Sequence, residues 1–570
     1  MSFRKVIPVF FVYAVLAISC EGAMARTIYV DNTLATNCTT SNYSIDSRAC
    51  SGVDGLSYKS IQEALDAMQV GDEIVLRGGT YQEGHIRINY KKSGISWSPG
   101  QFNTLRSYDG EWAILDGQNG GGSGGTNGLR VGADQNSACV LGLTTADTAG
   151  TYDLKYWKFE RLEIKNGSSA DGSTGVGFAG NGGPFIFRYV YIHDNLALSG
   201  SSNPGGLQGQ VWKDSLVEYS VFERNGCSLD NHNCADINIF SDYKPDTIAQ
   251  FGYNDSGHSI MRNEFRYNIF VGSPVGIKYK QDQFLTGRNP AGGYPLTDTF
   301  KHYGDKVHHN IFQGNISCGI DARQDFIQLY NNIFDSSHSA IFVGEGDTRS
   351  IYKAVVYNNT ILSPVANGIW RVHQDSYTFQ PVEYYGYDFN NILDSVNDGW
   401  NWSDIALGAI KFTTRSPNFS NYVSDRNYFY RPGKANIKDL NGTFVECFGT
   451  DRLTVADMEA RYPGTNLFRE EFNQNSPLYK GETGTEKYKT VANHLVEGAL
   501  TVADGGRGGI HPYLPNVQIP SYIGAANPAM DSGKNWDPTQ PAPDDAGWVD
   551  YVSKLKFTLI PPSLLNINIK

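Results

Sequence analysis

A short motif that returns through the middle of the chain constrains the fold more than any other feature. Its copies are YNIF (267–270), HNIF (309–312), NNIF (331–334), NNTI (358–361) and NNIL (390–393). The central asparagines lie 42, 22, 27 and 32 residues apart. This spacing is typical of a solenoid in which loops of different length leave successive coils. We expect the asparagines to stack as a ladder that binds the backbone of the turns, which is a structural role.

A second repeated strand follows each copy, and its alignment predicts which side chains face outward. The copies are ADINIFSD, VGIKYKQD, CGIDARQD, SAIFVGEG and NGIWRVHQD. Period-two alternation directs one set inward, namely Ile237, Ile239, Ile277, Tyr279, Ile320, Ala322, Ile341, Val343 and Ile369. The outward set is then Asn238, Phe240, Lys278, Lys280, Asp321, Arg323, Phe342, Gly344, Trp370 and Val372. Adjacent coils are about 4.8 Å apart, so Lys280 and Arg323 should be stacked neighbours.

These patterns predict an all-β chain, a single right-handed parallel β-helix with a short N-terminal capping helix and long loops on one side. The helix is expected over Ser60 to Met68, where Ser60 and Glu63 form a capping box. The long loops are 241–258, which leaves the preceding coil, and 282–305, which follows the strand that carries Lys280. Two such loops would form the walls of a groove, with Lys280 on its floor.

The ends of the chain suggest an exported protein with three parts. Residues 1–25 have the composition of a signal peptide, 26–400 form the catalytic β-helix, and 401–570 form terminal coils and a C-terminal segment packed on its outside. A short helix is expected near Val455 to Tyr462. Lipid anchoring at Cys20 is an alternative to cleavage. No other segment is long enough to span a membrane, and the protein is expected to be secreted or periplasmic.

The cysteine pairs agree with an oxidising compartment. Cys38 lies close in sequence to Cys50, and Cys227 lies close to Cys234, so each pair can close a local loop. The other cysteines of the mature chain, which are expected to be buried thiols, are Cys139, Cys318 and Cys447.

Charge limits the partners of this chain. The net charge of −12 argues against nucleic acid and would repel a polyanion from most of the surface. An acidic polysaccharide therefore needs a local basic patch, which Lys278, Lys280 and Arg323 supply. A lysine among other cations has a lowered pKa and can act as a base. Beside it, a cation can neutralise the carboxylate of a uronate while the C5 proton is removed.

The paired strands GIKYKQ and GIDARQ resemble those of the chondroitinase B and alginate lyase family, in which a lysine and an arginine occupy consecutive coils. Lys280, four residues after Gly276, is also similar to the catalytic lysine strand of the calcium-dependent pectate lyases built on long β-helices. The segment GDEIVLRGGTYQEG looks like the opening coils of both groups. The resemblance covers residues 55–395 as architecture.

This resemblance implies a polysaccharide lyase in which Lys280 is the base and Arg323 assists with the carboxylate or the leaving oxygen. The expected substrate-binding residues are Lys278, Asn238, Phe240, Asp321, Phe342, Trp370 and His373. The resemblance also implies calcium as a possible cofactor, for which the candidate ligands are Asp236, Asn238, Asp242 and Glu345. A monomer is expected.

Four other interpretations stay open at this point. Lys278 and Asp321 could pair across coils as part of a solvated edge. A polygalacturonase-like hydrolase would need two carboxylates, for which the chain offers Asp321, Asp325 and Asp236. A uronate epimerase would share the first step of the lyase. A noncatalytic solenoid that binds carbohydrate would not depend on a stacked lysine and arginine.

Overall fold

The structure is a computed structural model of the whole chain. The residues it describes are 25–83, 86–118, 129–130, 138–144, 154–167, 173–179, 182–196, 204–210, 214–227, 233–240, 263–280, 304–308, 310–324, 327–330, 332–335, 337–344, 354–357, 359–362, 367–373, 383–389, 391–394, 410–414, 418–430, 437–441, 468–472, 509–510 and 518–519.

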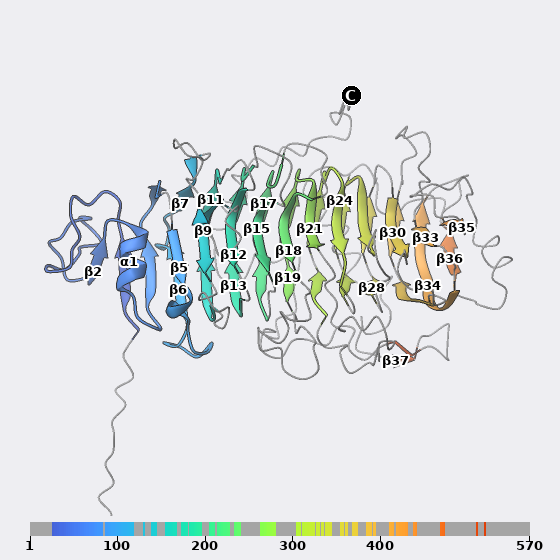
Figure 1. Cartoon of the computed structure of the whole chain (residues 1–570), viewed down its shortest axis with the longest axis horizontal. Coiled ribbons are helices and arrows are strands. Elements are labelled where there is room, and N and C mark those ends of the chain that lie inside the picture. Colours follow the sequence, from blue (N-terminus) through green and yellow to red (C-terminus); the bar gives the residue numbers. More distant parts are fainter. Residues whose placement is uncertain are drawn as a thin grey trace, which may run out of the picture.

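The described residues form a parallel β-helix, which confirms the predicted fold. Each coil contributes one short strand to each of three columns, and every strand pairs in parallel with the strand one coil away. Figure 1 shows these strands stacked along the long axis, from α1 and β2 at one end to β35 and β36 at the other. The coils continue past residue 400, because β33 pairs with β30 and β34 pairs with β31.

The first column begins at the N-terminal end, where β2 (Leu56–Tyr58) pairs with β1. Its strands are β1 (Thr27–Val30), β3 (Glu73–Leu76), β6 (Asn103–Ser107), β10 (Trp157–Glu160), β13 (Phe185–Arg188), β16 (Leu216–Glu218), β19 (Glu264–Arg266), β22 (Lys306–His308), β25 (Gln328–Tyr330), β28 (Ala354–Tyr357), β31 (Glu383–Phe389), β34 (Asn418–Tyr430) and β36 (Phe468–Phe472).

The second column runs beside the first, and the two meet in β34, which pairs with both β31 and β32. Its strands are β4 (Gly79–Tyr81), β7 (Ala113–Asp116), β11 (Leu162–Lys165), β14 (Tyr191–His193), β17 (Val221–Glu223), β20 (Ile269–Val271), β23 (Ile311–Gln313), β26 (Ile333–Asp335), β29 (Thr360–Leu362) and β32 (Ile392–Asp394).

The third column carries the repeated strands that the sequence singled out. Its strands are β5 (Ile86–Asn89), β9 (Ala138–Thr144), β12 (Ser173–Ala179), β15 (Gly205–Gln210), β18 (Ala235–Phe240), β21 (Val275–Lys280), β24 (Cys318–Ala322), β27 (Ser339–Val343), β30 (Asn367–His373), β33 (Ile410–Thr414) and β35 (Ile437–Asn441). Outside the columns, β8 (Leu129–Arg130) pairs antiparallel with β9, and β37 (Gly509–Ile510) pairs antiparallel with β38 (Gln518–Ile519).

The core fills the space between the columns, and the predicted inward residues line it. All of the isoleucines aligned in β18, β21, β24, β27 and β30 are fully buried and pair in register. In the second column, the inward rings of Phe222, Phe270, Phe312 and Phe334 stack with centroids 5.1, 4.7 and 4.8 Å apart. These separations match the spacing of hydrogen-bonded strands, so the coils stack without a lateral shift.

The predicted asparagine ladder is present between the first and second columns. The rungs are Asn268, Asn310, Asn332, Asn359 and Asn391. In each rung after Asn268, the side-chain oxygen accepts from the backbone N–H and the Nδ2 of the preceding asparagine, at 2.9 to 3.1 Å. Asn268 Oδ1 accepts from the backbone N–H of Ser220 at 3.0 Å. Each Nδ2 also donates to a carbonyl in the core, as from Asn332 to Val307 at 2.9 Å. The ladder therefore satisfies buried backbone groups at every turn.

The N-terminal end of the solenoid is covered by α1 (Ile61–Ala67), as the capping box predicted. Ser60 Oγ accepts from the N–H of Glu63 and contacts the Glu63 carboxylate at 3.0 Å. Glu83 adds two bonds that the sequence did not indicate, since it accepts from the N–H groups of Ile61 and Gln62. These contacts satisfy the first free N–H groups of the helix. A 3₁₀ turn, η1 (Tyr90–Lys92), follows β5.

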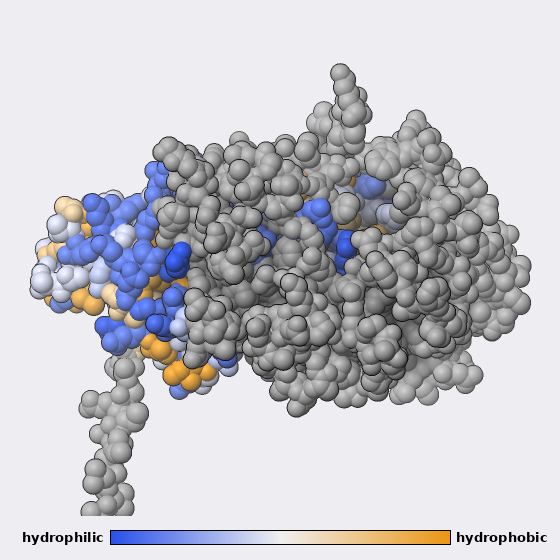
Figure 2. Space-filling model, in the orientation of Figure 1, coloured by the Kyte–Doolittle hydropathy of each residue, from blue (hydrophilic) through white to orange (hydrophobic). Residues whose placement is uncertain are grey.

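Both expected disulfides are present, Cys38–Cys50 and Cys227–Cys234, and Cys318 is a buried thiol. In Figure 2 the N-terminal end of the described surface is largely hydrophilic. Within the described residues no helix is long and apolar enough to cross a membrane. Cys20, Cys447 and the helix expected near Val455 to Tyr462 lie outside the described residues, as do residues 1–24 of the expected signal peptide.

Candidate functional site

One line of register on the third column joins five of the predicted site residues. The pairing joins Asn238 in β18 to Lys278 in β21, and Lys278 to Asp321 in β24. It continues from Asp321 to Phe342 in β27 and from Phe342 to Trp370 in β30. Figure 1 shows β18, β21 and β24 next to one another near the middle of the solenoid. The alignment of the sequence repeats therefore predicted this register correctly.

Two cations and one carboxylate form a compact cluster on this line. Lys278 Nζ lies 3.4 Å from Asp321 Oδ2. Arg323, directly after β24, donates to the same carboxylate through Nε at 2.8 Å and Nη2 at 2.9 Å. Two parallel hydrogen bonds of this kind fix the plane of the guanidinium. Among its described residues the cluster has two cations and one carboxylate, in a protein whose net charge is −12.

The members of this cluster differ in exposure. The side chains of Lys278 and Asp321 are 1% and 4% exposed, whereas that of Arg323 keeps 16% of its surface exposed. Burial lowers the pKa of Lys278, Asp321 opposes this shift, and the nearby Arg323 charge adds to it. Arg323 is thus the most exposed member of the cluster. Lys278 is buried and contacts the Asp321 carboxylate that also binds Arg323.

Two aromatic side chains continue the line beyond the cluster. The rings of Phe342 and Trp370 meet edge to face with centroids 5.1 Å apart, and both are half-buried. The Arg323 guanidinium lies 5.9 Å from the centroid of the Phe342 ring. A cation beside partly exposed aromatic rings is an arrangement that suits an acidic sugar, because the rings can stack on the apolar face of a pyranose.

The central residues of this line were expected to face outward from the sheet, and the structure shows that they are buried. Asn238, Lys278 and Asp321 are all almost fully buried. Asn238 Nδ2 donates to the carbonyl of Asn233 at 3.1 Å. Alternation assigns a residue to the outer face of a sheet, but it does not say whether other parts of the chain cover that face. The ion pair between Lys278 and Asp321, one of the alternatives open from the sequence, exists together with the Arg323 contact.

For several predicted site residues the structure gives the position of the backbone but not of the side chain. Lys280 ends β21 and pairs in register with Phe240 in β18. Since Lys278 pairs with Asp321, the residues two further along, Lys280 and Arg323, are expected to lie level on neighbouring coils. His373 ends β30 and pairs with Thr414. The side chains of Lys280, Phe240 and His373 lie outside the description, as do residues Asp242, Asp325 and Glu345.

Asp236 points into the solenoid and not toward the outer face. Its Oδ1 accepts from Asn225 Nδ2 at 2.9 Å and from Ser273 Oγ at 2.5 Å. Full burial raises the pKa of Asp236 to about 8. A buried, protonated carboxyl is a poor ligand for calcium, which prefers ionised oxygen ligands. Across the described parts of the chain, no group of three or more His, Cys, Asp or Glu side chains could hold a metal ion.

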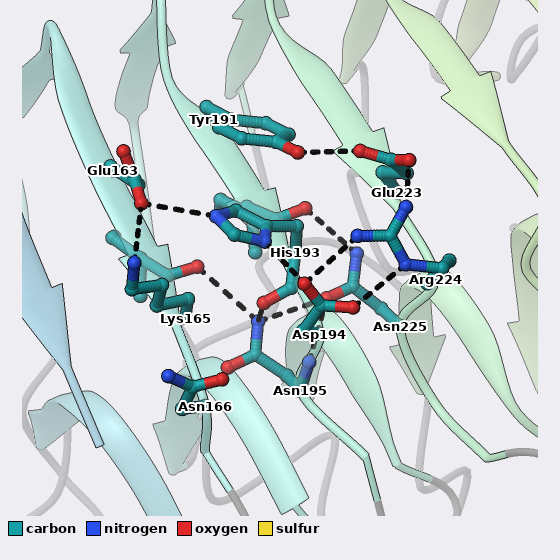
Figure 3. Close-up of polar contacts among 12 residues, drawn as sticks. Glu163, Lys165, Asn166, Tyr191, His193, Asp194, Asn195, Glu223, Arg224 and Asn225 are labelled. Carbon is teal, nitrogen blue, oxygen red and sulfur yellow. Dashed lines mark hydrogen bonds and ion pairs between the residues drawn. The ribbon is translucent and has the colours of Figure 1, made fainter. Parts of the chain in front are cut away.

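A second polar cluster, which the sequence reasoning missed, covers the outer face of the second column (Figure 3). His193 lies at its centre, with Nδ1 2.7 Å from Asp194 Oδ2 and Nε2 3.2 Å from Glu163 Oε1. Lys165 contacts Glu163 at 3.0 Å. Arg224 binds Asp194 through two hydrogen bonds of 2.8 and 2.9 Å. Positive and negative groups alternate here, as expected of a stabilising network.

Titration in this second cluster follows from its contacts. Burial alone would lower the pKa of His193, but hydrogen bonds to Asp194 and Glu163 outweigh it and the pKa is raised. Burial alone would raise the pKa of Glu163, yet the contacts from His193, Lys165 and Trp112 lower it to about 2. The aligned segments LEIKN, YIHDN and VFERN, which supply the cluster one coil apart, were the sequence signal that could have found it.

A third set of charges, also missed, runs along the first column. Register pairing alternates the signs of its members, in the order Arg106, Glu160, Arg188, Glu218 and Arg266. Glu218 accepts from Arg188 Nε at 2.6 Å and from Arg266 Nε at 2.8 Å. This line holds three arginines and two glutamates, and Glu218 joins the arginines on either side of it by ion pairs across the coils.

Comparison with known proteins gives one sequence relative. No family model matches the chain. A stretch of 109 residues is 35% identical to pectate lyase PEL9 of Emericella nidulans (strain FGSC A4 / ATCC 38163 / CBS 112.46 / NRRL 194 / M139), covering 19% of this chain and 23% of that protein. The match thus spans about a quarter of the length of the curated relative. Over this stretch, the expected resemblance to pectate lyases is confirmed.

Solved structures similar to this one include further lyases. An alginate lyase from Paenibacillus sp. str. FPU-7 is 14% identical, with 73% of this chain and 99% of that chain covered and a TM-score of 0.34. Pectate lyase Pel9A is 14% identical, with 67% and 83% covered and a TM-score of 0.36. A mannuronic acid specific polysaccharide family 6 lyase from human gut microbiota is 10% identical, with 76% and 96% covered and a TM-score of 0.40.

Proposed function

We propose that the protein is a polysaccharide lyase that cleaves a uronate-containing polysaccharide by β-elimination at the outer face of the third column. The cluster of Lys278, Asp321 and Arg323 is the observation that carries this proposal. It combines a net positive charge with partly exposed aromatic rings in an otherwise acidic protein. Such a patch attracts a polyanion where the rest of the surface repels it. The sequence match to a pectate lyase supports the same reaction class.

In the proposed reaction, the neutral amine of Lys280 removes the proton at C5 of the uronate. The electron pair left on C5 forms the double bond between C4 and C5, and the bond from C4 to the glycosidic oxygen breaks. A proton then passes to the leaving oxygen. The products are a shortened chain and a chain whose new end is an unsaturated uronate.

Arg323 supplies the charge that this step needs. Removal of the C5 proton moves negative charge onto the neighbouring carboxylate, so a fixed cation beside that group stabilises the transition state. Asp321 holds the guanidinium in one plane through two hydrogen bonds, which orients Arg323 before substrate binds. The further cation at Lys278 adds to the local positive field, and this field disfavours protonation of Lys280.

No step of this mechanism uses calcium. Of the four candidate ligands, Asp236 points inward and Asn238 is buried, while Asp242 and Glu345 belong to the segments outside the description.

Residues 1–25 are proposed to be a signal peptide for export, 26–400 the catalytic β-helix and 401–570 its terminal coils and C-terminal segment. The substrate-binding roles of Phe240, Phe342, Trp370 and His373 are likewise part of the proposal.

A hydrolase is less well supported by the described residues. Inverting hydrolysis needs one protonated and one ionised carboxyl group facing the same bond. Asp321 is engaged by two cations, and Asp236 faces the interior. The two carboxyl groups therefore do not face a common space, and the geometry favours elimination.

A panel of acidic polymers tests the proposal. The purified protein is incubated with pectate, alginate, chondroitin and dermatan while ultraviolet absorbance and new reducing ends are followed together. We expect both signals to rise in parallel with at least one polymer, because each elimination creates one unsaturated end and one reducing end. Reducing ends without absorbance would show hydrolysis and refute the proposal. Neither signal, combined with retention of the protein on a polymer gel, would support a binding protein.

A further inference from the structure

A buried acid lies directly behind the proposed site. Tyr279 stands between Lys278 and Lys280 in β21, and its ring points inward, where it is fully buried. Its hydroxyl group donates to Asp305 Oδ2 at 3.0 Å. Asp305 directly precedes β22 and is itself fully buried. The strand that carries both lysines is thus hydrogen-bonded, on its core side, to the carboxyl group of Asp305.

The same residue also reaches the neighbouring coil of the site. The backbone N–H of Asp305 donates to Gln324 Oε1 at 2.7 Å. Gln324 directly follows Arg323 and is fully buried. Asp305 therefore contacts a residue adjacent to each of the two cations that the proposed mechanism uses, Lys280 through Tyr279 and Arg323 through Gln324.

A ladder role alone does not explain why this residue is an acid. Asp305 accepts from Asn263 through the backbone N–H at 2.9 Å and through Nδ2 at 3.1 Å. In the asparagine ladder, a single amide oxygen accepts the same two bonds, as Asn332 does from Asn310. An asparagine at 305 would therefore serve Asn263 equally well. What the carboxylate adds is an acceptor for the Tyr279 hydroxyl.

An acid at this position also has an energetic cost. Burial raises the pKa of Asp305 to about 7, although bonds from Asn263, Tyr279 and Gln324 oppose the shift. An ionisable group in an apolar interior costs stability that a neutral amide would not. Tyr279 is a titratable residue among the described hydrogen-bond partners of Asp305, and burial raises the pKa of its hydroxyl well above the ordinary value.

We infer that Asp305 is a positioning residue that sets the separation between the strand of Lys280 and the side chain of Arg323. The inference rests on the proposed function, because it assigns a purpose to this separation. Proton transfer and charge neutralisation must act on one sugar ring at once, and a displacement of 1 Å in such a site costs up to about 10²-fold in rate. Two direct hydrogen bonds from one buried residue limit that displacement.

Three variants remove the positioning contacts one at a time. Tyr279→Phe removes the hydroxyl and keeps the ring in the core. Asp305→Asn keeps the bonds to Asn263 and replaces the acceptor for Tyr279. Gln324→Leu removes the side-chain oxygen that accepts from the backbone N–H of Asp305. The matched control is Tyr81→Phe, because Tyr81 is also buried and donates its hydroxyl to Val30 and Arg77 carbonyls in the N-terminal coils.

Two readouts are measured on the full-length chain for each variant. The first is kcat and KM for elimination, together with the melting temperature. We expect kcat to fall about 10- to 10²-fold in the three variants with little change in KM, and to stay unchanged in Tyr81→Phe. The second readout does not need activity: the pH dependence of Lys280 acylation, followed by mass spectrometry. We expect its profile to shift in the three variants and not in the control.

The outcomes separate this inference from the proposed function. Wild-type kcat and acylation profiles in Tyr279→Phe and Asp305→Asn would overturn the inference, and so would an equal loss in Tyr81→Phe, which would indicate general destabilisation. If the wild-type protein eliminates no polymer and the acylation profiles still shift, the positioning role stands and the proposed function fails. If elimination occurs and neither readout responds, the proposed function stands and the inference fails.

Discussion

Replacement of Asn332 by alanine measures how much the asparagine ladder contributes to stability. The side chain of Asn332 takes part in four hydrogen bonds of 2.9 to 3.1 Å and is fully buried. After the substitution, Asn310 Nδ2 still donates to Phe265, and Asn359 Oδ1 still accepts from the Asn332 backbone. The Asn310 N–H and the Val307 carbonyl, however, lose the side-chain partner described here.

The expected loss follows from those two groups. Each buried polar group left without its partner costs about 1–3 kcal/mol, so Asn332→Ala should lower the free energy of unfolding by about 4 kcal/mol. Asn332→Ser should cost less, because a serine can accept from a backbone N–H, as Ser220 does from Val190 in the same ladder. Asn42, which is exposed, is the control, and Asn42→Ala should change stability by less than about 0.5 kcal/mol.

Denaturant unfolding gives the overall loss, and hydrogen exchange followed by mass spectrometry locates it. In a solenoid each coil contacts its neighbours, so faster exchange should be confined to peptides from β22 to β26 and absent from β3 to β7. A loss for Asn332→Ala no larger than that for Asn42→Ala would refute the ladder as a source of stability. Uniformly faster exchange along the whole solenoid would refute its local action.

Three further predictions concern other contacts. The raised pKa of His193 means that its contribution to stability is complete below pH 6.5, the ordinary value, and is lost as the pH rises through the folded value. His193→Gln should therefore destabilise the protein in acid and have little effect in alkaline solution, and an equal effect in melting experiments at both would contradict the assignment. Removal of the Cys38–Cys50 disulfide with Cys38→Ser should cost about 2–3 kcal/mol in denaturant unfolding, and no loss would mean that this loop contributes nothing. Arg323→Lys gives up one of two bonds to Asp321, so kcat/KM for elimination should fall about 10- to 10²-fold, and an unchanged value would remove Arg323 from the mechanism.

The fold and the register of the site could be predicted because the repeats carry them locally. One isoleucine at the same position of all five copies determined which residues share an outer line, and the pairing of Lys278 with Asp321 follows from that alignment. The asparagine ladder could also be predicted, because the same asparagine recurs in each copy of the motif, where its side chain binds the backbone of the turn.

The orientation of Asp236 could not be predicted by alternation, because the register of strand pairing is interrupted at that position. Ala235 pairs with Val275 and Ile237 with Ile277, but no pairing joins Asp236 to Gly276. A Cβ atom at Gly276 would lie 2.6 Å from the Phe312 ring in the core, so this position faces inward. The period-two pattern therefore changes phase here, and an alignment of residue types does not reveal it.

Burial and buried partners were the other missing parts. The sequence placed Lys278 and Asp321 on the outer face, but a local pattern of residue types does not record whether a residue on that face is buried. The contact between Tyr279 and Asp305 joins residues on different coils with no repeated motif around the acid. A single contact between distant segments leaves no repeated pattern in the sequence.

The most direct test of the proposed mechanism is the rate of elimination by Lys280→Ala on the polymer that the wild-type protein cleaves. Loss of a general base should lower kcat by about 10²–10⁴-fold, with the melting temperature and polymer binding nearly unchanged. Lys59→Ala, at an exposed lysine of the N-terminal coils, is the matched control and should keep full activity. Wild-type kcat in Lys280→Ala would contradict the mechanism.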